Sequence, residues 1–218
     1  MTVKRLFDIF VSLAILLLIW PLLLLIAVLI RLDSPGSAVF SQRRAGYKGE
    51  PFTLYKFRTM VYDVEPYGVS PQSGNDPRLT KIGKILRETS LDELPQLFNV
   101  LAGSMSLVGP RPLYERQAEK WNERQRRRLD ARPGITGWAQ IKGRGEIPIE
   151  EKIELDIYYL EHISLLLDIK IIVYTFLQSI GKGQGIYEKH YSHDSEKETE
   201  APNDEIIRNK CPGCKNHE

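Results

Sequence analysis

The sequence predicts a mainly helical α+β protein that carries one small β-hairpin. Three observations support this fold class: an uncharged run of about 22 residues near the N-terminus, apolar residues at helical spacing over much of residues 80–180, and two short segments between them that alternate apolar and polar side chains. A hydrophobic content of 42% and a charged content of 27% over 218 residues are typical of globular proteins, so most of the chain should fold.

The overall charge and the cysteine content restrict the class of protein. A formal net charge of +2 argues against a dedicated nucleic-acid binder, and no nucleic-acid partner is expected. The two cysteines, Cys211 and Cys214, both lie in the last few residues. No disulfide framework is therefore available to the body of the protein, which fits a reducing compartment.

Residues 1–33 are expected to form a membrane anchor. As a helix, the uncharged run at residues 9–30 could cross a hydrocarbon core of about 30 Å, and it lacks the small-residue exit of a cleaved signal peptide. Pro21, which follows Trp20, removes a backbone hydrogen bond and favours a kink. Basic residues flank the run on both sides, which favours the cytoplasmic side for both ends. A re-entrant helix kinked at Pro21 is therefore predicted in preference to a single span, with Trp20 either packed against the kink or facing lipid.

Residues 34–182 are expected to form the folded domain of the chain. Within it, residues 38–44 and 51–60 are predicted to pair as a β-hairpin across a loop-like segment. Lys56 and Arg58 would share one face of the second strand, where they either meet phosphate or form a solvated surface. Residues 63–78 are polar and rich in proline and glycine, and they predict a loop.

An acidic pair, Asp92 and Glu93, follows a predicted helix at residues 80–87 that ends in Arg87. If the next helix starts near Asp92, Pro95 lies in its first turn, where proline is tolerated, and the helix dipole keeps both carboxylates ionised. Such carboxylates suit a nucleophile or a metal ligand. Ser90 and Glu93 also fit a capping box, which would give Glu93 a structural role. An apolar stripe on this helix is predicted to be core: Leu94, Leu97, Phe98 and Leu101.

Basic residues outnumber acidic ones between residues 111 and 132, and they include the run at residues 126–128. This segment is either a solvated helix face or a surface for anionic lipid headgroups. Residues 150–166 and 165–180 have helical patterns, and the second is amphipathic and expected to lie at the membrane surface. His162 is expected at the protein surface. Asp168 either binds substrate or pairs with Lys170 or an arginine.

The remaining residues, 183–218, are polar and are expected to be disordered. Cys211 and Cys214 form half of a zinc-binding pattern, which His190, His193 or His217 could complete. A single C-x-x-C with irregularly spaced histidines leaves open whether zinc binds there.

Several motifs together resemble the bacterial sugar transferase family, the monotopic phosphoglycosyl transferases. They are S-L-D-E-L-P-Q-L-F-N-V-L at residues 90–101, S-M-S-L-V-G-P-R-P at 104–112 and R-P-G-I-T-G at 132–137. The resemblance extends over roughly residues 4–180, from Lys4-Arg5 to Asp168-Ile169-Lys170. In relatives the residue before the kinking proline is often serine, whereas here it is Trp20.

The resemblance implies an enzyme that moves a sugar 1-phosphate from a UDP-sugar to polyprenol phosphate. Asp92 would be the nucleophile that attacks the β-phosphate and carries the phosphosugar while UMP leaves. Glu93 would bind Mg²⁺, with Asp92 as a second ligand, or position the acceptor phosphate. The enzyme would lie in the bacterial inner membrane among its lipids, with residues 34–182 as the catalytic domain on the cytoplasmic face.

Arg111, in the Gly-Pro-Arg-Pro turn, is the first candidate for a bidentate phosphate clamp. Further candidates for substrate binding are Lys56, Arg58, Arg87, Arg144 and Asp168, any of which could instead form a salt bridge within the fold. The sequence leaves open whether the protein is a monomer or a homodimer. Two alternatives remain: a non-catalytic, membrane-anchored module that binds anionic lipid, and a single-span protein with a metal-dependent phosphatase domain.

Overall fold

The structure, a computed structural model, describes residues 2–62, 64, 70–119 and 121–180, without the side chains of residues 2, 144, 179 and 180. Its elements follow in chain order: α1 (Thr2–Asp33), β1 (Val39–Ala45), η1 (Tyr47–Gly49), β2 (Pro51–Phe57), α2 (Lys81–Glu88), η2 (Leu91–Glu93), α3 (Gln96–Ala102), β3 (Ser106–Val108), α4 (Glu115–Glu119), α5 (Glu123–Arg126), η3 (Arg127–Asp130), β4 (Gly134–Thr136), α6 (Trp138–Lys142), η4 (Arg144–Glu146), α7 (Ile149–Glu161) and α8 (Leu165–Ile180). The prediction of a mainly helical chain with a small hairpin is confirmed. The predicted tail and zinc site lie outside the described residues.

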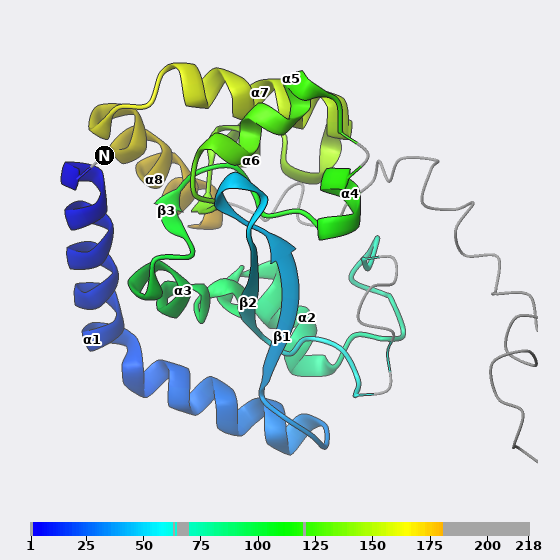
Figure 1. Cartoon of the computed structure of the whole chain (residues 1–218). Helices are drawn as coiled ribbons and strands as arrows, with labels where there is room; N and C mark the ends of the chain where they lie inside the picture. Colours follow the sequence, from blue (N-terminus) through cyan, green and yellow to red (C-terminus); the bar gives the residue numbers. More distant parts are fainter. Residues whose placement is uncertain (1, 63, 65–69, 120, 181–218) are drawn as a thin grey trace, which may run out of the picture.

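Helix α1 contains 32 residues, with Pro21 in its interior, and by length and composition it could cross a membrane. Figure 1 shows that its ribbon changes direction part way along its length. Proline is an ordinary cause of such a bend because it breaks one backbone hydrogen bond. Trp20 is 58% exposed, so it does not pack against the protein, which favours the lipid-facing alternative. Re-entry into the same leaflet remains a prediction.

Polar side chains near the start of α1 attach it to the rest of the fold. The guanidinium of Arg5 donates to the carbonyl oxygens of Val100 and Leu101, which lie at the end of α3. Carbonyls at a helix end lack partners within the helix, so a cation suits this position. The buried carboxylate of Asp8 accepts from Ser106 Oγ at 2.7 Å and from a backbone N–H of β3. Helix α1 is thus joined to the domain by specific bonds.

Two small sheets form in different ways. Strands β1 and β2 pair antiparallel, as predicted, with Val39 opposite Phe57 and Ala45 opposite Pro51. Strands β3 and β4 pair in parallel, with Ser106 opposite Gly134. The sequence did not predict this second sheet, because each of its strands has only three residues. A side chain at Gly134 would meet the backbone N of Gly109 at 2.1 Å, so the close approach of the two strands requires glycine.

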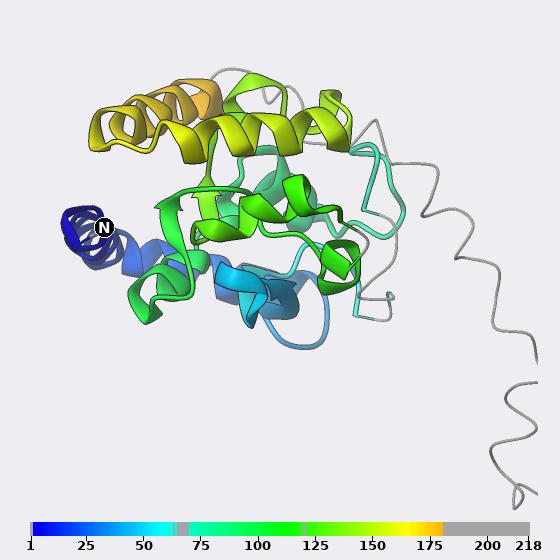
Figure 2. The same ribbon diagram turned by 45° about the horizontal axis from the view of Figure 1, so that its top comes forward.

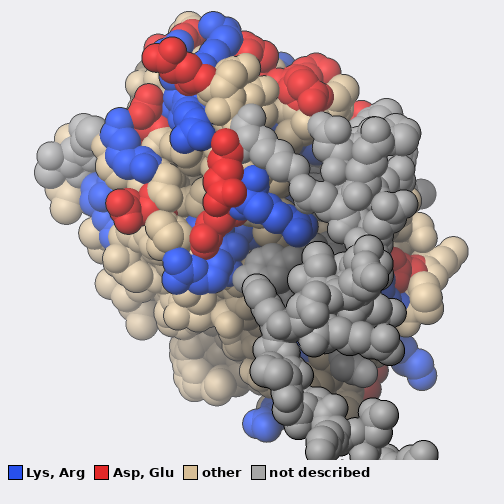
Figure 3. All heavy atoms as spheres, turned by 45° about the vertical axis from the view of Figure 1, so that its right-hand side comes forward, with Lys and Arg blue, Asp and Glu red and all other residues tan. Residues whose placement is uncertain are grey.

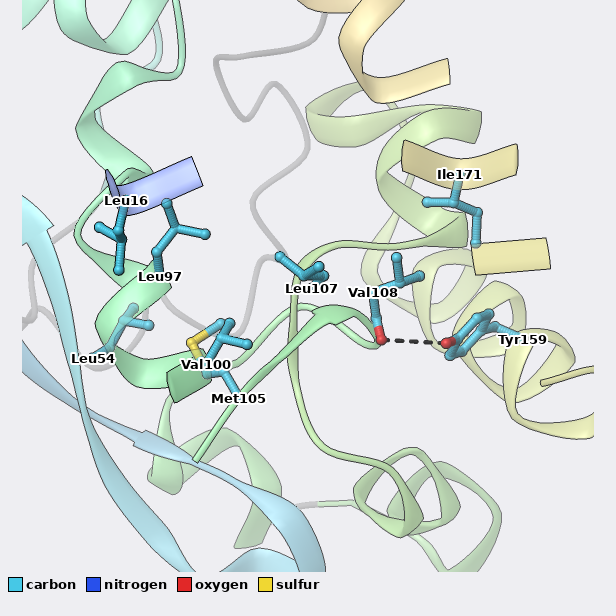
Figure 4. Close-up of a cluster of buried hydrophobic side chains, with 9 residues drawn as sticks. All are labelled: Leu16, Leu54, Leu97, Val100, Met105, Leu107, Val108, Tyr159 and Ile171. Atoms are coloured by element: carbon cyan, nitrogen blue, oxygen red, sulfur yellow. Dashed lines mark hydrogen bonds between the residues drawn. The ribbon is translucent and has the colours of Figure 1, made fainter. Parts of the chain in front are cut away.

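The main core cluster lies between α1, β2, α3, β3 and the C-terminal helices (Figure 4). Its buried members are Leu16, Leu54, Leu97, Val100, Met105, Leu107, Val108, Tyr159 and Ile171. Phe98 was predicted to be core, but it is 52% exposed because the buried face of α3 runs through Leu97 and Val100 instead. Figure 2 shows α7 and α8 together on one side of the molecule and the β1–β2 hairpin on the other.

Candidate active site

The acidic pair lies in η2, a single 3₁₀ turn between α2 and α3. Helix α3 begins only at Gln96, with Pro95 at its N-cap, so both carboxylates precede the helix instead of occupying its first turn. The predicted capping box is wrong. Ser90 has a φ of 58°, in the left-handed region, and its side chain makes no capping bond. The carboxylate of Glu93 instead accepts hydrogen bonds from two cationic side chains.

Glu93 is the point where three distant segments meet. Its Oε1 accepts from Arg111 Nη2 at 2.9 Å and from Lys56 Nζ at 3.3 Å. Lys56 comes from β2, and Arg111 comes from the turn after β3. Burial opposes ionisation of Glu93, but the nearby charges of Arg111 and Lys56 outweigh it and lower its pKa to about 2. Glu93 is therefore ionised throughout the physiological pH range.

Asp92 has the opposite electrostatic character, although it is the next residue. Its side chain is buried, with 7% of the residue exposed. Burial first, and then the negative charge of Glu93, raise its pKa to about 6, while Lys56, Arg87 and Arg111 partly offset this rise. The sequence predicted that a helix dipole would hold Asp92 fully ionised; instead it titrates just below neutral pH. Adjacent acids whose pKa values are driven apart are typical of sites that assign them different chemical roles.

Three of the predicted phosphate-binding residues surround this pair. Lys56 and Arg111 contact Glu93, and the partly buried Arg87, at the end of α2, is near enough to lower the pKa of Asp92. Burial lowers the pKa of Lys56 itself, with Arg111 acting in the same direction and Glu93 against it. The structure thus brings these cations together, while phosphate binding by them remains a prediction.

Arg58 and Asp168 were predicted substrate-binding residues, and the structure places both in buried contacts elsewhere. Arg58 donates to the carbonyl oxygens of Ser34 and Pro35, which anchors the segment after α1. Strand β2 ends at Phe57, so Arg58 no longer follows the strand alternation that would place it beside Lys56.

Asp168 pairs with Lys4 at 2.6 Å and accepts from the hydroxyl of Tyr159, also at 2.6 Å. The predicted pairing with Lys170 or an arginine is wrong, because residues two apart on a helix do not face each other and Lys4 approaches from α1. The backbone of Arg144 lies in η4, but its side chain is outside the described part of the structure.

The basic run at residues 126–128 is not uniform. Arg126 and Arg127 are exposed, and Arg127 pairs with Glu161 on the surface. Figure 3 shows Lys and Arg interspersed with Asp and Glu over the upper part of the molecule in that view. Arg128, by contrast, is buried and ion-paired with Asp156 of α7. Neither predicted alternative, a solvated face or a lipid-binding face, describes Arg128. His162 is exposed, as predicted.

Two residues that support the site were missed. Asn99 of α3 accepts from the backbone N of Tyr55 and donates to the carbonyl of Thr53, so it fixes β2 next to Lys56. A polar residue within the apolar pattern of residues 97–101 was the signal for it. Arg44 of β1 stacks over the ring of Tyr114, 3.7 Å from its centroid, and its charge acts on Lys56.

The carboxylate pair suits a magnesium ion that is shared with a phosphate ligand. No group of three His, Cys, Asp or Glu side chains gathers anywhere in the described ranges. Mg²⁺ is commonly held by one or two carboxylates together with substrate phosphates and water, which needs no larger protein cluster. Glu93 Oε1 accepts both described hydrogen bonds from the cations.

The arrangement therefore provides one buried, weakly acidic carboxylate beside a permanently ionised carboxylate and several converging cations. Cations around a carboxylate favour the approach of an anionic, phosphorylated ligand. A carboxylate that is largely ionised at neutral pH, yet more basic than an ordinary aspartate, is suited to attack a phosphorus atom.

Comparison with known proteins identifies relatives of this chain. A family model described as bacterial sugar transferase matches residues 1–182. The chain is 43% identical to an uncharacterized sugar transferase, EpsL, of Bacillus subtilis (strain 168), over 88% of this chain and 93% of that protein. It is also 46% and 45% identical to proteins of Xanthomonas campestris pv. campestris and Escherichia coli (strain K12) that are named UDP-glucose:undecaprenyl-phosphate glucose-1-phosphate transferases. These alignments cover 75% and 79% of this chain, but only 36% and 39% of those longer proteins.

Proposed function

Because the chain belongs to the bacterial sugar transferase family, we propose that it transfers a sugar 1-phosphate from a UDP-sugar to polyprenol phosphate and releases UMP. The observation that carries this proposal is the pair of adjacent carboxylates with opposite pKa shifts. Asp92 is buried and titrates at about 6, while Glu93 is ionised and bound by two cations. A lipid-binding module without catalysis has no reason to place two adjacent carboxylates beside Arg87 and Arg111.

In the first step, a carboxylate oxygen of Asp92 attacks the β-phosphorus of the donor. The bond from this phosphorus to the oxygen that bridges it to the α-phosphate breaks, and UMP leaves with the electron pair. In the second step, a phosphate oxygen of the polyprenol phosphate attacks the same phosphorus, and Asp92 leaves as a carboxylate. Neither step transfers a proton to or from Asp92. The covalent intermediate divides one difficult displacement into two easier ones.

The division of labour between the two acids follows from their surroundings. Glu93 is a poor nucleophile because its negative charge is held by Arg111 and Lys56. Asp92 is more basic, and with a pKa of about 6 it is still mostly ionised at pH 7. Arg111, Lys56 and Arg87 would offset the negative charge that spreads over the phosphoryl oxygens during each displacement.

We also propose Mg²⁺ as the cofactor, which Glu93 would hold, with Asp92 as a second ligand. A bound metal ion would lower the charge on the phosphoryl oxygens. Helix α1 is proposed to hold the enzyme at the cytoplasmic face of the bacterial inner membrane, where the polyprenol acceptor lies. The length and apolar character of α1 support this location.

The mechanism is tested with a panel of UDP-sugars carrying ³²P in the β-phosphate. Purified full-length protein is incubated with each donor without acceptor, then denatured and examined for protein-bound label. We expect UMP release and label on the wild type and on Glu154→Gln, a control whose exposed carboxylate pairs with Arg124 on the surface. Asp92→Asn should take up no label.

The outcomes separate the competing mechanisms. Label on Asp92→Asn would overturn the assignment of the nucleophile. UMP release that requires acceptor and leaves no label would replace the two-step mechanism with direct transfer. An absence of UMP release with every donor, with or without acceptor, would count against the enzyme assignment and favour the lipid-binding alternative.

A further inference from the structure

The backbone of residues 108–113 is held in place from several sides. The carbonyl of Val108 accepts from Lys4 Nζ and from the hydroxyl of Tyr159. Gly109 N donates to the carbonyl of Thr136, and the carbonyl of Pro110 accepts from Gly134 N. The carbonyl of Leu113 accepts from Ala45 N in β1. This segment contains Arg111. Because its backbone is fixed, the position from which the Arg111 side chain extends is fixed as well.

Arg128 supplies the bond at Arg111 itself. Its Nη2 donates to the carbonyl oxygen of Arg111 at 2.9 Å, and the same nitrogen donates to Asp156 Oδ2. Arg128 is 3% exposed, and its guanidinium lies 5.0 Å from the centre of the Trp121 ring. The contact joins η3 and α7 to the turn that contains Arg111.

A contribution to folding stability does not by itself explain why Arg128 and Asp156 form a buried ion pair. Within the described part of the chain, Arg128 Nε and Nη1 and Asp156 Oδ1 are buried without a hydrogen-bond partner. Unsatisfied polar atoms reduce the benefit of a buried ion pair, and apolar residues of similar size often replace such pairs without loss of stability. The bond to the carbonyl of Arg111 is something that an apolar pair could not provide.

We propose that Arg128, held by Asp156, is a positioning residue that fixes the turn of Arg111 so that its guanidinium reaches Glu93. The inference rests on the proposed function for its kinetic consequences, because Arg111 then acts on the phosphoryl group. Arg128 does not touch the reacting atoms and acts through Arg111 alone. Its effect should therefore disappear once the side chain of Arg111 is removed.

The test is a double-mutant cycle on the full-length protein. Arg128→Met combined with Asp156→Leu replaces the ion pair with apolar side chains, which avoids leaving one buried charge alone. We expect kcat for UMP release to fall by about 10- to 100-fold, as for a misplaced catalytic group, with a smaller change in KM. Arg128→Lys should recover part of the activity, because its ammonium can still donate to the carbonyl. Arg127→Met, in the same basic run but on the surface, should stay within about twofold of the wild type.

The combined variant is then made in an Arg111→Ala background. We expect no further loss beyond that of Arg111→Ala alone. Losses that multiply, or full activity in the Arg128→Met/Asp156→Leu protein, would overturn the inference. A purely structural role would lower the fraction of folded protein in both backgrounds equally.

A second measurement does not depend on turnover. Guanidinium ¹⁵N NMR can follow the bond between Arg111 and Glu93, with Arg111→Lys identifying the signal. The signal should shift or broaden in the Arg128→Met/Asp156→Leu protein and remain unchanged in Arg127→Met. An unchanged signal in both would refute the positioning role, even if the wild type released no UMP and the proposed function itself had failed.

Discussion

The replacement of Asp92 by asparagine should stabilise the folded protein at neutral pH while it removes the proposed nucleophile. In the folded state the pKa of Asp92 is raised from 3.8 to about 6, chiefly by burial. Between those two values, the folded protein binds a proton that the unfolded chain does not bind. Stability is therefore lost as pH rises through this range, and the whole cost is present above pH 6.

The size of the effect follows from the two pKa values. They differ by about two pH units, and each unit corresponds to about 1.36 kcal/mol, so ionised Asp92 costs the fold roughly 3 kcal/mol at pH 7. Asparagine does not titrate and avoids this cost. For a chain of this size, the gain corresponds to an increase in Tm of about 6 to 12 °C at pH 7. Near pH 4 the two proteins should unfold at the same temperature.

The assay is thermal unfolding in detergent micelles from pH 4 to pH 8. Glu93→Gln is the matched control, because it removes the neighbouring carboxylate, whose pKa is lowered to about 2. Glu93 stabilises the fold above pH 4.5, so its replacement should lower Tm at pH 7. The reasoning would be refuted if Asp92→Asn were no more stable than the wild type at pH 7, or if its gain were equally large at pH 4.

Three further predictions concern the surrounding residues. Arg111→Ala removes a charge that lowers the pKa of Asp92, so the acid limb of the pH profile of kcat/KM for UMP release should move to higher pH. Arg58→Met removes buried bonds to two carbonyls and should lower the unfolding free energy by about 2 kcal/mol in denaturation experiments, while kcat per folded molecule is kept. Asp168→Asn leaves the charge of Lys4 without its ionised partner, so it should lower the unfolding free energy by about 3 kcal/mol in the same denaturation experiment. Lys170→Gln, on the exposed face of the same helix, should change the unfolding free energy little.

Local patterns in the sequence were sufficient for most of the secondary structure. The alternation near Lys56 predicted the β1–β2 hairpin, and helical spacing predicted α2, α7 and α8. These elements depend on neighbouring residues, so their signals lie within a short window. The β3–β4 sheet depends instead on two three-residue segments that lie far apart in the chain. Their local sequence carries no pairing signal.

The candidate site was predictable in part for the same reason. The adjacency of Asp92 and Glu93 and the turn that contains Arg111 marked them as candidates, and the family resemblance implied their roles. The ion-pair partners of the other charged residues could not be predicted from the neighbouring sequence. Asp168 pairs with Lys4, 164 positions away, and Arg128 reaches both Asp156 and the Arg111 carbonyl. A sequence shows that an arginine is present, whereas only the fold shows whether it is buried.

Helix α1 contributes side chains to the core of the protein. Leu16 belongs to the main core cluster, and Ile26 and Ile30 pack with Phe57 and Leu86 in a second one. Cutting the chain after residue 33 would therefore open holes in both clusters and leave the carbonyls at the end of α3 without Arg5. Such a fragment would lack part of both core clusters. Studies of this protein in isolation should therefore keep the whole of helix α1.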